Sequence, residues 1–159
     1  VLIEPNNNEN IIIDTLCKVE ADDLNDVYYK TPFSSIDWIN EKFELSGTKV
    51  YKHGVQLTVD LIKEYLRKAK ATLEDFEFIV PHQANMRMLR EISDGLEIPI
   101  EKFLINIEHV GNTGGASIPI CLSEMHLNKK IKKGDRLLLC SFGSGYTVAI
   151  VDLKWNIEI

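Results

Sequence analysis

From residue 47 onward, the hydrophobic and polar positions follow clear periodicities that predict regular elements. One set of apolar residues recurs three and four positions apart: Tyr51, Val55, Val59, Ile62, Leu66 and Ala69. This spacing places the whole set on one face of a helix. A second helix is expected to begin after Asn85, a favourable N-cap, and to continue to Leu96. A third is expected over about residues 117–130.

Short apolar runs between these helices are typical of β-strands. They cover residues 76–80, 103–107, 136–142 and 146–155. Strands joined by crossover helices run parallel, so the first three are expected to point the same way. The last strand follows a tight turn and is expected to return beside its predecessor. The pattern therefore predicts an α/β fold, with a mixed, mostly parallel sheet flanked by helices.

The carboxyl ends of the three predicted parallel strands are expected to lie along one edge of the sheet. Just past those ends come His82, Asn112 and the segment 143–145 (GSG). Open α/β sheets bind their ligands at this edge. Three polar or glycine-rich segments that are far apart in the sequence are therefore predicted to form one site.

His82 and Asn112 allow a limited range of chemistry. An imidazole and a carboxamide beside a glycine-rich turn can donate N–H hydrogen bonds to a developing oxyanion or enolate. The histidine can alternatively act as a general base. Asn112 does not titrate, so its role would be to donate or to orient. Both residues also have a structural interpretation, as a hydrogen-bonded histidine and as an asparagine suited to a turn.

The composition narrows the class of protein. Of 159 residues, 45% are hydrophobic and 26% are charged, which is typical of a soluble globular domain. No apolar run approaches the roughly 20 residues that a membrane helix needs. The cysteines Cys17, Cys121 and Cys140 form no CxxC pair, which favours a reducing, cytoplasmic environment. Cys140 lies in an apolar run and is expected in the core.

Two kinds of binding site are excluded by spacing. Residues 111–115 (GNTGG) lack the Lys-Ser/Thr pair of a phosphate-binding P-loop and the spacing of a dinucleotide fingerprint. The four histidines and three cysteines show no metal-ligand spacing. The sequence therefore predicts neither a nucleotide cofactor nor a metal ion.

The net charge of −6 argues against a general nucleic-acid binder. The charge is also unevenly distributed, because residues 1–46 hold three basic and ten acidic residues. Residues 47–72 carry six basic residues against Asp60 and Glu64. This local excess suits an anionic partner, such as a phosphate or an acidic carrier protein. The alternative interpretation is a solvated helix face.

Three motifs together resemble the C-terminal half of beta-ketoacyl-ACP synthase III. They are residues 81–87 (PHQANMR), 111–119 (GNTGGASIP) and 142–147 (FGSGYT). The motifs occur in the order and spacing of that family, and the similarity runs from about residue 47 to the end. Residues 47–159 are thus expected to form the C-terminal thiolase-like domain. Residues 1–46 resemble, more weakly, the end of the N-terminal half with the connecting segment.

The resemblance implies a condensing enzyme that starts fatty-acid synthesis. In that family a cysteine takes the acyl group from an acyl-CoA primer, and malonyl-ACP then condenses with it after losing carbon dioxide. The resemblance implies that His82 and Asn112 hydrogen-bond the malonyl thioester oxygen as the enolate forms. It also implies that the backbone N–H of Ser144 is a further donor of the oxyanion hole. The family has glycine at this position. Lys52 and Arg87 match basic positions that dock the acyl carrier protein.

Further expectations follow from the resemblance and from the departures from it. Acyl-CoA and malonyl-ACP enter as substrates, no cofactor is expected, and the complete protein is expected to be a homodimer. No cysteine here fits the context of the family's nucleophile, so the chain is expected to be part of a longer enzyme and inactive alone. The sequence departs from the common family pattern at Ser144, at Val110 and at residues 114–115. Two alternative functions therefore remain open: an acyltransferase or ketosynthase of secondary metabolism, and a non-catalytic module that binds acyl carriers.

Overall fold

The computed structural model describes residues 11–20, 27–29, 43–45, 47–143 and 146–158. The strands are β1 Ile12–Val19, β2 Val27–Tyr29, β3 Phe43–Leu45, β4 Phe78–Pro81, β5 Arg136–Gly143 and β6 Thr147–Lys154. The α-helices are α1 Gly47–Ala69, α2 Met86–Gly95, α3 Ile107–Val110 and α4 Ser117–Leu127. Three short 3-10 helices are η1 Leu73–Asp75, η2 Ile100–Lys102 and η3 Gly114–Ala116.

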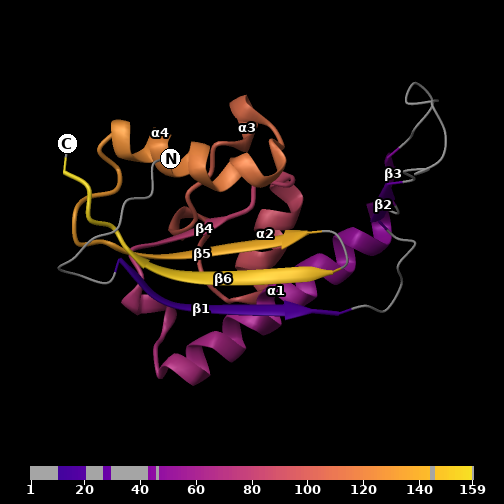
Figure 1. Ribbon diagram of the computed structural model, residues 1–159, viewed down its shortest axis with the longest axis horizontal. Helices are drawn as coiled ribbons and strands as arrows, with labels where there is room; N and C mark the ends of the chain where they lie inside the picture. The colour runs from indigo at the N-terminus through magenta and orange to yellow at the C-terminus, as the bar shows by residue number, and fades with distance from the viewer. Residues whose placement is uncertain (1–10, 21–26, 30–42, 46, 144–145, 159) are drawn as a thin grey trace, which may run out of the picture.

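Four of the strands form one mixed sheet in the order β1-β6-β5-β4, while β2 and β3 pair with each other. The β4 and β5 strands are parallel, with Ile79 opposite Leu138. The β5–β6 and β1–β6 pairs are antiparallel. The sheet is thus mixed and flanked by helices, as the sequence predicts, but it has more antiparallel pairing than expected. The extra pairing comes from β1, which adds to the edge of β6 (Figure 1).

The predicted strand at 103–107 is largely wrong. Only Phe103 forms a bridge, parallel to Ile79, and Leu104 N–H donates to the Ile79 carbonyl at 2.9 Å. The next donor, the backbone N–H of Asn106, turns instead to the side chain of Gln83 at 3.2 Å. A side-chain acceptor therefore ends the pairing, and residue 107 begins α3.

Helices cover both faces of the sheet, so the domain has two cores (Figure 1). On one face α1 and α2 pack against the sheet through fully buried apolar side chains, among them Ile62, Ile79, Ile92, Leu138 and Ile150. On the other face α4 packs through Cys121, Leu122 and Met125 against Val80 and Leu137. No described helix has the length and apolar character needed to cross a membrane.

The predicted start of α2 is confirmed. Asn85 is the N-cap, and its Oδ1 accepts a hydrogen bond from the Met88 N–H at 2.9 Å.

At the other end of α2, Gly95 allows a close approach to α1. A Cβ at this position would lie 2.9 Å from Cγ2 of Val59, so a larger residue would require Val59 or the helices to shift. The third helix also forms, but it ends at Leu127.

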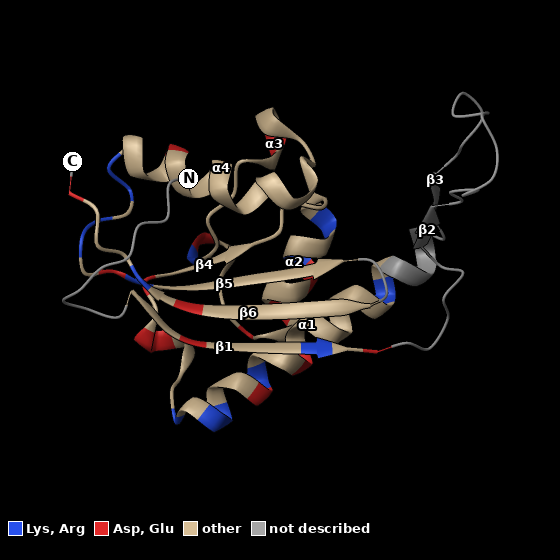
Figure 2. Cartoon of the chain, viewed as in Figure 1, with Lys and Arg blue, Asp and Glu red and all other residues tan. Residues whose placement is uncertain are grey.

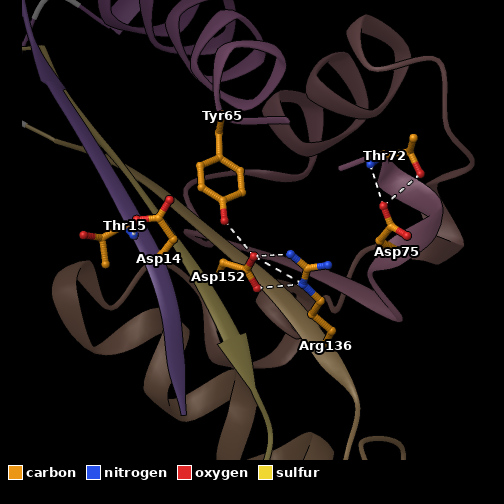
Figure 3. Close-up of polar contacts among 7 residues, drawn as sticks. All are labelled: Asp14, Thr15, Tyr65, Thr72, Asp75, Arg136 and Asp152. Atoms are coloured by element: carbon orange, nitrogen blue, oxygen red, sulfur yellow. Dashed lines mark hydrogen bonds and ion pairs between the residues drawn. The ribbon is translucent and has the colours of Figure 1, made fainter. Parts of the chain in front are cut away.

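The buried carboxylate of Asp152 links the sheet to α1, through an ion pair within the sheet and a hydrogen bond from the helix (Figure 3). Asp152 on β6 is fully buried, and Arg136 on β5 donates to its carboxylate from Nη2 at 2.6 Å and from Nε at 3.0 Å. The hydroxyl of Tyr65 on α1 donates to the same carboxylate at 2.6 Å. Burial, with Asp152 as a further cause, raises the pKa of Tyr65, so the phenol keeps the proton that it donates.

This arrangement predicts that Arg136→Met is strongly destabilising. The variant leaves the Asp152 carboxylate buried, with the Tyr65 hydroxyl as its remaining described partner, and an uncompensated buried charge costs about 3 kcal/mol or more. Urea unfolding measures the loss. The matched control is Lys68→Met, which removes an exposed pair with Glu64 on α1 and is expected to change stability little. Equal effects in the two variants would contradict the prediction.

Candidate functional site

His82 lies at the carboxyl end of β4, where the sequence places it. Its backbone N–H donates to the Cys140 carbonyl at 2.8 Å and so extends the parallel pairing by one residue. The imidazole is half-buried, with Nδ1 2.7 Å from the Ser117 hydroxyl oxygen. The ring also meets Phe142 edge to face, with 5.5 Å between the ring centroids.

These contacts bring the end of β4 together with the start of α4 and the end of β5. They involve Ser117 and Phe142, which neighbour the predicted segments in the sequence, so the meeting of His82 with Asn112 and residues 143–145 stays a prediction. The carboxyl ends of β4 and β5, together with the start of α4, therefore form one site around the imidazole.

Burial lowers the pKa of His82 below its usual value of 6.5. The charged imidazolium loses hydration in the half-buried position, and its described contacts are with a hydroxyl and an aromatic ring. The lowered pKa favours the neutral imidazole, in which one ring nitrogen is a donor and the other is an acceptor.

The neighbouring Gln83 was assigned no role from the sequence, although it is fully buried. Its Nε2 donates to the carbonyls of Pro81 and Leu104, at 2.8 and 3.1 Å. Its Oε1 accepts from the Asn106 N–H at 3.2 Å. The amide thus links the end of β4 to the segment that leads into α3. A glutamine directly after a buried strand was the available clue, because buried polar side chains need partners.

Asn112 lies in the exposed loop between α3 and η3. Its Oδ1 accepts a hydrogen bond from the Gly114 N–H at 3.0 Å, so the interpretation as a turn residue is supported. The turn needs glycine, because Gly111 and Gly114 have φ values of 74° and 58°. The amide oxygen of Asn112 accepts within the turn, and its amide nitrogen is the group that can donate to a ligand.

The third segment is described in part. Phe142 and Gly143 end β5, and β6 begins at Thr147. Ser144, the expected backbone donor of an oxyanion hole, lies outside the described residues. The Phe142 ring packs closely against Gly54 in α1, because a Cβ at residue 54 would lie 3.1 Å from the ring and would require a small shift.

Lys52 and Arg87 are exposed on α1 and α2. The Arg87 guanidinium lies 5.0 Å from the centroid of the Tyr51 ring, which places it against the turn of α1 that carries Lys52. Arg87 also pairs with Glu91 at 3.3 Å. Figure 2 shows acidic and basic positions intermixed along α1, and Lys68 pairs with Glu64 at 2.7 Å. The basic excess is therefore partly neutralised on the helix itself.

The cysteines are poor candidates for a nucleophile. Cys121 and Cys140 are buried in the two cores, where burial raises the pKa of each thiol to about 12. The expectation that Cys140 belongs to the core is thus confirmed. Cys17 is exposed on β1.

The fold matches solved structures with a thiolase-like fold. The 3-oxoacyl-(acyl carrier protein) synthase III of Pseudomonas aeruginosa PAO1 aligns with a TM-score of 0.82 and 28% identity, over 93% of this chain and 45% of that one. The synthase III of Aquifex aeolicus VF5 aligns with a TM-score of 0.82 and 29% identity, over 95% of this chain and 46% of that one. The chain has the architecture of part of a thiolase-like enzyme.

Sequence comparison defines the family. Residues 66–155 match the model described as 3-Oxoacyl-[acyl-carrier-protein (ACP)] synthase III C terminal, and the chain belongs to this family. The beta-ketoacyl-[acyl-carrier-protein] synthase III of Clostridium novyi (strain NT) is 41% identical over 115 residues, which cover 72% of this chain. That of Acholeplasma laidlawii (strain PG-8A) is 40% identical over 114 residues, again 72% of this chain. The aligned part is 36% of the length of each of these relatives.

The burial of the thiols predicts their reactivity. In the folded protein, iodoacetamide at pH 8 is expected to alkylate Cys17 and to leave Cys121 and Cys140 unmodified, because thiolate and access are both needed. Peptide mass mapping after timed quenching measures each site. The same reaction in 6 M urea is the control, in which all three cysteines should be modified. Alkylation of native Cys140 as fast as Cys17 would contradict its burial.

Proposed function

We propose that this chain is the C-terminal part of a beta-ketoacyl-ACP synthase III that condenses an acyl-CoA primer with malonyl-ACP. The observation that carries the proposal is the half-buried imidazole of His82 at the end of β4, held between Ser117 and Phe142. Family membership and the structural matches support the same reaction class. The acylated cysteine is assigned to a part of the enzyme outside this chain, as the resemblance implies. Cys121 and Cys140 are buried with raised pKa values, and the exposed Cys17 on β1 is not among the described contacts of the His82 imidazole.

In this proposal His82 and Asn112 act on the malonyl thioester. Its carboxylate leaves as carbon dioxide, and the electron pair of the broken C–C bond moves onto the thioester oxygen as an enolate. N–H groups of His82 and Asn112 donate to that oxygen. The enolate carbon then attacks the acyl thioester carbonyl, and the cysteine thiolate leaves. The backbone N–H of Ser144 is proposed to stabilise the oxyanion of this second step.

Neutral donors suit such a reaction. Full negative charge develops on the thioester oxygen only near the transition state, so preorganised dipoles stabilise that state more than the bound substrate. The lowered pKa of His82 also keeps the donor neutral at cytoplasmic pH. The rate is therefore expected to fall as the pH drops through this lowered pKa.

The catalytic proposal predicts separate effects on the two half-reactions. In the complete enzyme, His82→Ala and Asn112→Ala should each lower malonyl-dependent condensation by about 100-fold or more, which is typical for loss of an oxyanion donor. Acylation of the cysteine by the primer should continue at a similar rate. Radiolabelled primer and malonyl-ACP measure both steps. Asn128→Ala, at the end of α4, is the control. Near-normal condensation in either site variant would refute the assignment.

We also propose that Lys52 and Arg87 dock the acidic carrier protein, as the resemblance of these two positions to the family pattern implies. Both side chains are exposed, and the contact of Arg87 with Tyr51 places it against the same turn of α1 as Lys52. Long-range attraction between such groups and an acidic partner mainly increases the rate of association, and it has a smaller effect on the contacts made in the complex.

Charge reversal tests this docking surface. Lys52→Glu and Arg87→Glu are each expected to weaken binding of malonyl-ACP about threefold to tenfold at low salt, with a smaller effect at 0.5 M salt. Titration calorimetry on the complete enzyme measures the affinity. The matched control is Lys63→Glu, the same charge change at an exposed position further along α1. If all three variants bind alike, the basic residues form only a solvated face.

A further inference from the structure

The Ser117 hydroxyl is buried between two groups of the first motif. Ser117 begins α4 and is 1% exposed. Its Oγ lies 2.7 Å from Nδ1 of His82 and accepts the backbone N–H of Gln83 at 3.3 Å. The hydroxyl is thus in contact with the imidazole and with the residue that follows it in the chain.

The position of the hydroxyl proton follows from these two contacts. A backbone N–H can only donate, so Gln83 uses an acceptor position on Oγ. The buried O–H needs an acceptor of its own, and Nδ1 of His82 is within reach. If Nδ1 carried the proton instead, two N–H groups would point at Oγ, and its described contacts would offer the O–H no acceptor.

We propose that Ser117 is a positioning residue that holds His82 as the tautomer with the proton on Nε2. The hydrogen bond made by one ring nitrogen decides which nitrogen is protonated. This inference rests on the proposed function and deepens it, because it identifies the Nε2–H of His82 as the group that donates a hydrogen bond to the thioester oxygen. It also decides between the two roles open for His82. With its proton on Nε2, the neutral ring is a donor at that nitrogen and cannot accept a proton there.

The surroundings keep Ser117 in place. Its helix is anchored to the sheet by the buried side chains of Cys121 and Leu122. Gln83 is held by three side-chain hydrogen bonds of its own. The hydroxyl therefore sits between two fixed elements and presents its proton to Nδ1 with little freedom, which is what preorganisation requires.

Nitrogen NMR on the complete enzyme labelled with 15N-histidine tests the tautomer directly. The His82 signals are identified by their loss in His82→Gln. At pH 7.5 the wild type is expected to show a protonated, pyrrole-type Nε2 and a pyridine-type Nδ1. Ser117→Ala should lose this single-tautomer pattern, and Ser117→Thr, which keeps a hydroxyl, should restore it. Ser123→Ala is the control, because Ser123 is exposed on the same helix. A protonated Nδ1 in the wild type overturns the proposal, even if Ser117→Ala fails to fold.

Kinetics supply the second readout. Ser117→Ala is expected to lower kcat for condensation about threefold to tenfold with KM nearly unchanged, the usual effect of one lost hydrogen bond that orients a donor. An unchanged tautomer in Ser117→Ala overturns the proposal whatever the rate. If the tautomer responds but His82→Ala still condenses normally, the positioning role stands and the proposed function fails. The two failures are thus distinguishable.

Discussion

The geometry of the site depends on the buried amide of Gln83. Burying an amide without partners costs about 2 kcal/mol or more, and Gln83 avoids this cost through three side-chain hydrogen bonds. These bonds can all form only if the end of β4, Leu104 and Asn106 adopt one arrangement. The backbone N–H of the same residue adds Ser117 to that arrangement. His82 is therefore placed by a network in which the side chain of its neighbour fixes the surrounding backbone.

The elements that were predictable from the sequence are those with a local cause. The α1 helix follows from its apolar face, and α2 follows from the Asn85 cap and the same periodicity. The β5 and β6 strands follow from continuous apolar runs. Residues 103–107 have a similar apolar run, yet only Phe103 forms a bridge. The difference is the acceptor on Gln83, which lies 23 positions away in the sequence and leaves no local pattern.

The same distinction applies to the site. Topology alone predicted that His82 would meet the glycine-rich segments, because the carboxyl ends of parallel strands share an edge. The structure brings His82 to Ser117 and Phe142, which lie next to those segments in the sequence. The function of Ser117 was not predictable, because a serine at the start of a helix is ordinarily interpreted as part of the helix terminus. Only the three-dimensional contact shows that its hydroxyl faces an imidazole 35 positions earlier.

The distribution of charge fits the proposed chemistry. Around the imidazole, the described contacts are with neutral groups: the Ser117 hydroxyl and the Phe142 ring. The cations proposed to bind the carrier, Lys52 and Arg87, are exposed on helices. A cation beside the thioester would also attract the substrate carboxylate and so stabilise the ground state from which carbon dioxide must leave. Neutral donors respond mainly to the charge that forms on the oxygen, which lowers the barrier rather than the starting energy. In the proposed enzyme, attraction of the anionic carrier and stabilisation of the enolate are therefore assigned to different surfaces of the same domain.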